Sequence, residues 1–428
     1  MTDHGVTIVR RTATTQPITA DLLVVGAGIA GIAAAVEAAR LGRFVVLMDA
    51  GTALGGQSVG SMIGTFCGLY GNGPDYPQLT HGIATEVLAD LRAAGAAHDL
   101  VGRRNTIIVQ YRIDALARWI ERTVAAEAIQ VLLGAVLTEV EVTGTRIGTV
   151  HAATRFGPVA ITAGAVVDAS GDAAVAWTAG LACTMADAGP VQGTVMATLS
   201  GVDGEALAGL PKGAIRAALE ADATAEGLHR HDGFAFQFPG ADEVLVNMTH
   251  IETPLDPLAT AATLAAGREQ VDRLLGLLQR RFPGVFGRAV VSRYGQTGLR
   301  QTRSILGRAR LTVEAVRDGT RPDDAIGRCS WPIEFHGRPE AATWEEFGDH
   351  HLHWLPLSCQ LHQEVDNLIA AGRCIDADPL ALSSVRVMGP CIAMGTAAAH
   401  VADLAAGGPL HQVDRQRLAG RLAANLGL

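Results

Sequence analysis

The sequence has few cysteines for its length, and none of them lies close to another. Structural zinc sites, Fe–S clusters and redox dithiols all draw on closely spaced cysteines such as C-x-x-C pairs. The wide spacing here argues against all three, gives no metal site to predict, and fits reduced thiols in a cytosolic protein. The six residues are Cys67, Cys183, Cys329, Cys359, Cys374 and Cys391.

Basic clusters and long apolar runs are also missing. The chain carries 34 basic and 43 acidic residues, a net charge of −9, with no basic block, which disfavours nucleic acid and anionic membranes as partners. No run of 18 uncharged apolar residues suggests a membrane span, because the Ala-rich segment 32–41 is too short and contains Glu37 and Arg40. Arg10 and Arg11 precede a polar stretch, so we interpret residues 1–17 as a loose arm or edge strand rather than an export signal, and expect a cytoplasmic protein.

What is abundant is apolar residues and glycine. The 428 residues are 48% hydrophobic and include 50 glycines, which predicts two or three domains around a large α/β core with many tight turns.

The clearest local signal is the stretch 22–49, LLVVGAGIAGIAAAVEAARLGRFVVLMD. An apolar strand, a G-x-G-x-x-G turn at residues 26–31, an Ala-rich helix and a second apolar strand predict a βαβ unit. In such a unit Gly26 allows the tight turn, Gly28 lets the backbone approach a pyrophosphate, and Gly31 lets helix and strand pack closely. The helix N-terminus favours phosphate, and Asp49 can accept hydrogen bonds from a ribose. The stretch therefore predicts a dinucleotide site.

Two later glycine-rich segments extend this prediction. The pair Gly55-Gly56, followed by Gln57 and Ser58, allows a second close approach of the backbone, as a cofactor longer than one nucleotide requires. The turn Asp168-Ala-Ser-Gly-Asp172 follows a buried strand and can bring Gly171 against the same cofactor. Residues 59–77 lack a helical period but are too apolar for a solvated loop, so we expect a buried loop beside the cofactor.

The middle of the chain has a different character. Alternating patterns at 191–199, 234–238 and 244–248 predict antiparallel strands, and 214–226 and 258–282 predict helices. We expect a substrate domain at 184–356, inserted between two parts of a cofactor domain at 18–183 and 357–428. Arg300 and Arg303 would share one face if helical, and His351 and His353 would share one face of a strand.

Beyond residue 366, NLIAAGR predicts a strand and a glycine turn, followed by a helix from about Cys391 with Pro390 as its first residue. Together with GAGIAG, the Gly55-Gly56 pair, DASGD and GLRQTRSILG, this order of motifs resembles the FAD-dependent oxidoreductases of the glutathione-reductase-like fold. The resemblance covers about residues 20–406. The last helix reads Gly395-Thr-Ala-Ala-Ala where the family usually has G-Q-A-A-G.

The resemblance implies an α/β fold and a Rossmann FAD-binding domain with an inserted α+β substrate domain. We expect the FAD to be non-covalent, because no residue marks itself as an attachment point. It implies that the GAGIAG glycines hold the pyrophosphate, that Asp49 binds the ribose, that the second glycine segment follows ribitol and flavin, and that the helix at Pro390 faces the flavin. The implied cofactor residues are Gly26, Gly28, Ala30, Gly31, Asp49, Gly55, Gly56, Gln57, Ser58, Ala169, Gly171, Asp172, Gly372, Asp376, Arg386 and Pro390.

Residues for catalysis are chosen by chemistry. Guanidinium groups can grip a substrate carboxylate, and an amine or alcohol needs a base when it loses a proton. The candidates are Arg300, Arg303, Arg386, His336, His351 and His353, with Tyr294 and Glu334 as further bases. Packed histidines and a salt-bridging arginine face are the plain structural alternatives, and we expect Cys67 to be an inert thiol.

The expected function is oxidation of a small, carboxylate-bearing amine or alcohol by hydride transfer to flavin N5. No second complete G-x-G-x-x-G appears, which disfavours a built-in NAD(P)H site. The alternatives are a flavin-dependent desaturase or reductase acting at a C–C bond with an external electron partner, and a flavoprotein subunit of a larger complex. A small-molecule substrate is the expected partner, and a homo-oligomer or hetero-complex stays open.

Overall fold

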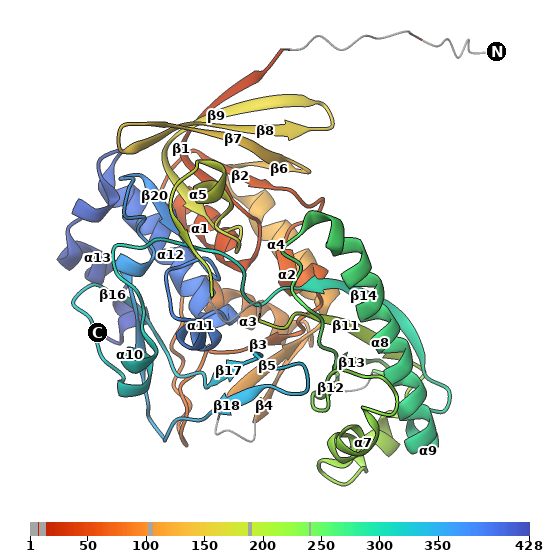
Figure 1. Ribbon diagram of the computed structural model, residues 1–428. Helices are drawn as coiled ribbons and strands as arrows, with labels where there is room; N and C mark the ends of the chain where they lie inside the picture. Colours follow the sequence, from red (N-terminus) through yellow and green to blue (C-terminus); the bar gives the residue numbers. More distant parts are fainter. Residues whose placement is uncertain (1–6, 8–13, 102–105, 187–190, 239–240) are drawn as a thin grey trace.

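The computed structural model describes residues 7, 14–101, 106–186, 191–238 and 241–428. Most of the predicted N-terminal arm therefore lies outside the described residues. The largest sheet has the strand order β6-β2-β1-β9-β8-β7, with β20 also paired to β9 (Figure 1). Strands β6, β2, β1, β9 and β20 run parallel, and β7 and β8 add an antiparallel hairpin. The strands are β1 Gln16–Val25, β2 Val45–Asp49, β6 Ile129–Leu133, β7 Val136–Thr143, β8 Arg146–Thr154, β9 Gly157–Asp168 and β20 Leu368–Ala370.

The predicted βαβ unit is confirmed as β1, α1 (Ile29–Arg40) and β2. Strand β1 begins at Gln16, earlier than the apolar run suggests, because Gln16 pairs with Val159 of β9. Its last four residues are buried, as expected of a strand covered on both faces.

Helix α12 (Met388–Ala405) packs against α1, as Figure 1 shows for the blue and red helices. It begins at Met388, so Pro390 is its third residue and not its first. Two short helices, α13 and α14, follow near the C-terminus. The other helices of this part are α3 Ile83–Ala93, α4 Ile113–Ala126, α5 Ala174–Thr178, α10 Val313–Asp318, α11 Pro379–Val385, α13 Arg415–Arg421 and α14 Ala423–Leu426, with the short 3-10 helices η2 Leu357–Cys359 and η3 Leu410–Gln412.

A second sheet has the order β12-β13-β11-β14 and is antiparallel, as predicted. Helix α8 lies along it (Figure 1). A separate apolar core forms here, from Val195 to Ala289, whereas buried residues from Ile305 onward join the core of the large sheet. The division at 183 and 356 stays a prediction. The elements are β11 Thr194–Ser200, β12 Phe234–Gln237, β13 Val244–Asn247, β14 Val290–Gly298, α6 Gly204–Ala208, α7 Ala214–Asp222, α8 Thr260–Arg281, α9 Pro283–Phe286 and η1 Pro257–Ala259.

Small sheets connect these two parts. They are β3-β5-β4 and the pairs β10-β15, β16-β19 and β17-β18. The bounds are β3 Thr65–Phe66, β4 Ala97–Val101, β5 Ile107–Tyr111, β10 Cys183–Thr184, β15 Ser304–Ile305, β16 Ala325–Cys329, β17 Ile333–Phe335, β18 Thr343–Glu345 and β19 His353–Pro356, with the short helix α2 at Gly56–Gly60.

Two local predictions are wrong. Residues 299–303 have no regular structure, because they join β14 to β15, so Arg300 and Arg303 do not share a helix face. His351 precedes β19, which begins at His353, so the two histidines do not alternate on one strand.

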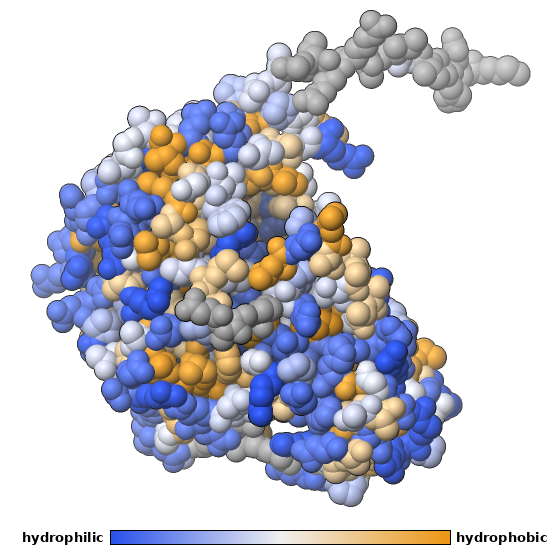
Figure 2. Space-filling view, in the orientation of Figure 1, coloured by the Kyte–Doolittle hydropathy of each residue, from blue (hydrophilic) through white to orange (hydrophobic). Residues whose placement is uncertain are grey.

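Apolar residues occur in scattered groups on the largely hydrophilic face shown in Figure 2. Within the described part of the chain, no single helix is long and apolar enough to cross a bilayer. Helices α11 and α12 meet those criteria only together, with a 90° bend between them. All six cysteines are free thiols.

Candidate functional site

A cavity of about 720 Å³ lies between the large sheet, the second sheet and the start of α12. Segments far apart in the sequence form its wall, because the carboxyl ends of β1, β2, β9 and β20 meet at one edge of the sheet. Most of the predicted site residues line it: Gly26, Gly28, Ala30, Asp49, Gly56, Gln57, Ser58, Ala169, Gly171, Asp172, Arg300, Gly372 and Arg386.

The first glycine turn is shaped by close backbone contacts. Gly26 has φ +105°, and a Cβ there would lie 2.4 Å from the Ala169 carbonyl oxygen. A Cβ on Gly31 would lie 1.8 Å from the Gly26 carbonyl oxygen, so Gly31 serves packing behind the cavity, as predicted for the third glycine. At Gly28, by contrast, a Cβ would meet nothing within 4 Å. The open space therefore lies where a phosphate would approach the N-terminus of α1.

Asp49 ties the ends of the two strands together. Its Oδ2 accepts from the Ala27 N–H and its Oδ1 from the Gly51 N–H, both at 2.6 Å. A carboxylate has lone pairs beyond these two bonds, and Asp49 also lines the cavity. The residue can therefore shape the turn and still accept from a ribose hydroxyl.

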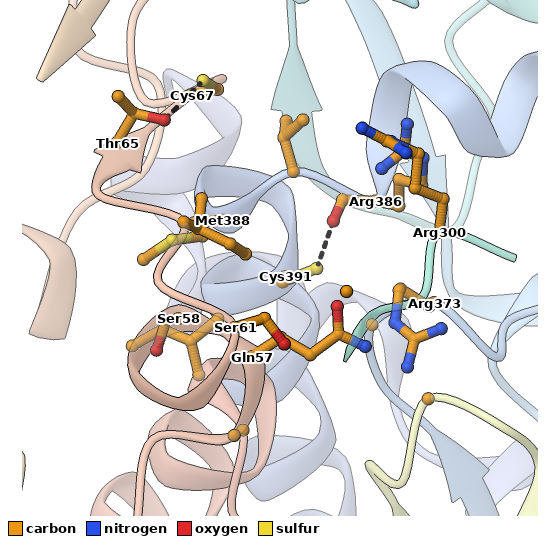
Figure 3. Close-up of a pocket in the computed structure, with 18 of the residues that line it drawn as sticks. Gln57, Ser58, Ser61, Thr65, Cys67, Arg300, Arg373, Arg386, Met388 and Cys391 are labelled. Atoms are coloured by element: carbon orange, nitrogen blue, oxygen red, sulfur yellow. Dashed lines mark hydrogen bonds between the residues drawn. The ribbon is translucent and has the colours of Figure 1, made fainter. Parts of the chain in front are cut away.

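The second glycine segment meets the first. A Cβ on Gly56 would lie 2.8 Å from the Gly28 Cα, and the Gly55 N–H donates to the Ala27 carbonyl oxygen at 2.8 Å. Gly55 does not line the cavity, and its role is to hold this contact with φ +101°. Gln57 and Ser58 then face the cavity from α2, as Figure 3 shows.

The DASGD turn is held by its first residue. The buried Asp168 carboxylate accepts from the N–H of Ser170, the hydroxyl of Ser170 and the N–H of Val175. Burial raises the pKa of Asp168, and these hydrogen bonds oppose the shift. Residue Asp172 lines the cavity and does not cap α5, whose N-cap is Ala173.

Arg373 lies against this turn and was missed by the sequence reasoning. It lines the cavity, and its Nη2 would lie 2.4 Å from a Cβ on Gly171. Its Nη1 is buried and has no hydrogen-bond partner among the described residues. An unpartnered buried donor on a residue that lines the same cavity as Gly28 fits a phosphate ligand.

The residues present fit the two phosphates and ribose of a dinucleotide such as FAD. The features that fit are the open space at Gly28, the N–H groups at the start of α1, the Arg373 guanidinium and the Asp49 carboxylate. Residues between Gly56 and Cys67 and the start of α12 line the same cavity.

Besides Gly31 and Gly55, two further predicted cofactor residues do not line the cavity. Asp376 is 2% exposed and accepts from the Gly307 N–H at 2.9 Å and from Arg310 Nε at 2.8 Å, so it supports a loop instead of facing ribitol. Pro390 lies against Gly68, while Val387 and Met388 before it line the cavity. The N-terminus of α12 thus borders the cavity, and its contact with the flavin stays a prediction.

Further guanidinium groups line the cavity. Figure 3 shows Arg300 and Arg386 near each other, with Arg373 on the same side of the cavity. Arg300 is 7% exposed, and its Nη1 donates to the Gln192 carbonyl oxygen at 2.6 Å. Burial is the largest cause that lowers the pKa of both Arg300 and Arg386, and neighbouring arginines add to it. Among the described residues, no carboxylate forms an ion pair with either group.

Aromatic side chains form the wall beside these arginines. Phe234 and Trp344 meet edge to face with centroids 6.4 Å apart, and Trp344 is the same distance from Trp331. Phe234 also stacks on Phe236 at 5.8 Å. All four residues line the cavity, so an apolar surface adjoins the cationic one.

The three histidines predicted as catalytic lie behind the wall, not in it. His336 is 1% exposed and contacts Glu334, which does line the cavity. His353 is buried, and its Nε2 contacts the Ser384 hydroxyl at 2.9 Å. His351 stacks on Phe347 with centroids 4.0 Å apart. Direct contact of these rings with substrate is therefore not what the geometry favours.

The remaining candidates are placed as follows. Arg303 lies over the ring of Trp177 at 4.4 Å and donates from Nε to the Asp172 carbonyl oxygen, outside the cavity. Tyr294 pairs with Asp272 on an exposed face. Cys67 lines the cavity, but burial raises the pKa of its thiol, in keeping with an inert residue.

Comparison with known proteins identifies a family that matches this chain. The family described as FAD dependent oxidoreductase matches residues 21–422. No curated protein matches the chain. A geranylgeranyl bacteriochlorophyll reductase-like protein from Thermoplasma acidophilum superposes with a TM-score of 0.51 and 15% identity, over 95% of this chain and 83% of that chain.

Two other solved structures are more distant. A flavin-dependent brominase has a TM-score of 0.47 and 13% identity, over 95% of this chain and 83% of that one. The p-nitrophenol 4-monooxygenase of Pseudomonas putida DLL-E4 has a TM-score of 0.46 and 13% identity, over 96% and 81%. The glycine cradle, the open phosphate site and the match over nearly the whole length agree: the chain belongs to the FAD-dependent oxidoreductase family, and FAD is the cofactor that this family and fold imply.

Proposed function

We propose that the protein oxidises a small carboxylate-bearing amine or alcohol whose body is apolar or aromatic. The observation that carries the proposal is the pair of buried guanidinium groups, Arg300 and Arg386, that line the cavity; the charge of Glu334 acts on both, but no direct ion pair to a carboxylate forms among the described residues. When bound, FAD supplies the two-electron acceptor for such an oxidation.

The arginines favour an anionic substrate for an electrostatic reason. Burial and mutual repulsion both disfavour two neighbouring positive charges. A carboxylate placed between them would relieve both effects and could accept paired N–H bonds. Arg386 has a buried Nε without a partner among the described residues, which is a donor available for this purpose.

The aromatic wall favours a particular kind of group on the part of the substrate that does not carry the carboxylate. Phe234, Trp331 and Trp344 present ring surface to the cavity within one cluster. Such surface favours an apolar or aromatic group over a second charge. The expected substrate class is therefore an amino or hydroxy acid with an apolar side group.

Anaerobic titration tests this proposal. The FAD-loaded protein is mixed with amino acids, amines, hydroxy acids and NAD(P)H, and the flavin absorbance near 450 nm is followed. We expect bleaching by an apolar amino or hydroxy acid and none by the matching compound without a carboxylate. Bleaching by NAD(P)H alone would contradict the proposal and favour a reductase acting at a C–C bond.

Arg300→Gln identifies the carboxylate contact. We expect retained FAD and a rise of roughly 10- to 100-fold in the substrate concentration for half-bleaching, as expected for loss of a charge-assisted hydrogen bond. Arg293→Gln is the matched control, because Arg293 is exposed and lies on β14 just before this segment. Equal titration curves for both variants would exclude Arg300 from substrate binding.

A further inference from the structure

A chain of hydrogen bonds runs inward from the cavity at Glu334. Glu334 Oε1 lies 3.0 Å from His336 Nε2. On its other side, His336 Nδ1 lies 2.8 Å from His250 Nε2. The chain ends where His250 Nδ1 lies 2.6 Å from the Pro339 carbonyl oxygen. Glu334 lines the cavity, whereas both histidines are buried behind it.

The direction of each bond follows from its inner end. A carbonyl oxygen can only accept, so His250 carries a proton on Nδ1, and a neutral His250 then accepts at Nε2. His336 must therefore donate from Nδ1, which leaves a neutral His336 with a lone pair on Nε2. That lone pair faces a Glu334 oxygen at 3.0 Å. Two acceptors at hydrogen-bond distance need a proton between them, so the pair of Glu334 and His336 holds one proton.

The charged groups around the pair oppose this proton. Burial is the largest cause that places the pKa of His336 well below its ordinary value, and the guanidinium groups of Arg300, Arg230 and Arg386 add to it. Further titratable groups of the described chain act on this cluster: Asp232, which pairs with Arg230, Cys67, and Arg373 and Cys391 through Arg386. The hydrogen-bond geometry requires a proton between Glu334 and His336, whereas the neighbouring guanidinium groups disfavour it. We therefore expect this proton to exchange readily.

We propose that Glu334 is the acid–base residue of the site and that His336 and His250 are positioning residues that fix its shared proton. The inference rests on the proposed function for its substrate and goes beyond it by assigning the proton transfer. In the oxidative direction the substrate's O–H or N–H bond breaks and that proton passes to ionised Glu334. It is then held between Glu334 and His336, while the hydride on carbon goes to the flavin. Activity should therefore rise with pH as the pair loses its resting proton.

Glu334→Gln provides a direct test, because an amide N–H can donate permanently to His336 Nε2 without exchanging a proton. The protein is labelled with ¹⁵N-histidine, and the ring signals are followed between pH 6 and 9, with His336 assigned from the spectrum of His336→Gln. We expect the Nδ1–H form of His336 in both proteins. The Nε2 signal should move with pH in the natural protein and stay constant in Glu334→Gln.

Kinetics of the same variant complete the test. We expect Glu334→Gln to keep FAD, to lose about 100-fold or more in the rate of flavin reduction, and to lose the rise of rate with pH. Glu340→Gln, an exposed residue in the following loop, should match the natural protein.

The imidazole signals need no substrate, so they distinguish this inference from the proposed function. An Nε2–H form of His336, or identical pH responses in the natural protein and Glu334→Gln, would overturn the shared proton. The expected signals together with unchanged kinetics would overturn the catalytic role of Glu334. A failed substrate titration alone would count against the proposed function only.

Discussion

At the residue scale, Arg373 explains why position 171 is glycine. The Arg373 guanidinium occupies the space where a side chain at 171 would begin, and Gly171 has φ +78°. Asp172 lies 3.6 Å from the same guanidinium, and the buried Nη1 points to no protein acceptor among the described residues. Arg373 thus joins the turn after β20 to the DASGD turn and keeps one buried donor unpaired among the described residues.

Arg373→Gln should therefore weaken cofactor binding. We expect the dissociation constant for FAD to rise roughly 10- to 100-fold, because a charge-assisted hydrogen bond to phosphate is lost. Flavin fluorescence released on dilution measures this constant. Arg308→Gln is the control, since Arg308 pairs with Asp366 away from the cavity. Unchanged FAD affinity in Arg373→Gln would show that the unpaired Nη1 donor of Arg373 does not reach the cofactor.

His353 should contribute to acid sensitivity. Burial lowers the pKa of His353 to about 3, below its ordinary value near 6.5. Between these two pKa values the His353 ring is protonated in the unfolded chain and neutral in the folded protein, so the free energy of unfolding falls as pH falls. One such group contributes at most about 1.4 kcal/mol per pH unit. Urea unfolding of His353→Gln from pH 7 to 4 should show a shallower loss of stability than the natural protein. Parallel curves would contradict this assignment.

At the element scale, the contact between α1 and α12 holds the cavity together. Both helices are almost entirely buried, and small residues at their contact let the backbones approach closely. A Cβ on Gly395 of α12 would lie 2.1 Å from the Ala30 carbonyl oxygen of α1. The contact thus fixes the N-terminus of α12, which borders the cavity, relative to α1.

Gly395→Ala should separate these helices. We expect a destabilisation of about 1–3 kcal/mol, as for overpacking of a core, together with weaker FAD binding. Thermal unfolding with and without FAD measures both effects. Gly420→Ala in α13 is the matched control, because nothing lies within 4 Å of its Cβ and alanine favours the helix by roughly 0.5–1 kcal/mol. Equal melting temperatures of Gly395→Ala and Gly420→Ala would contradict a steric clash at Gly395.

At the scale of the whole molecule, the sequence predicts what local pattern determines. The βαβ unit, its three glycines and Asp49 are confirmed in place because one short segment contains the strand, turn and helix. The antiparallel character of the middle region and FAD as cofactor follow equally from pattern and motif order.

Long-range contacts account for what the sequence did not predict. Arg373 packs against Gly171, which lies about 200 residues earlier in the chain. Asp376 is buried because it accepts hydrogen bonds from Gly307 and Arg310. The spacing of Arg300 and Arg303 fits a helix and a loop equally well, so only the tertiary structure separates the cavity residue from the one over Trp177. The histidines were predicted by type, but the residue of this group that lines the cavity is Glu334, the hydrogen-bond partner of His336.

The placement of β9 between β1 and β20 has a consequence for how the protein is made. The cavity wall begins at Gly26 and is completed only by residues up to Cys391. At about 5–20 residues per second, a ribosome needs roughly 20–70 s to synthesise that interval. During this time, apolar surface of β1 and α1 stays exposed, because later parts of the chain that cover it in the folded protein are not yet synthesised. We therefore expect FAD to enter after synthesis, and the nascent chain to depend on chaperones for most of its time on the ribosome.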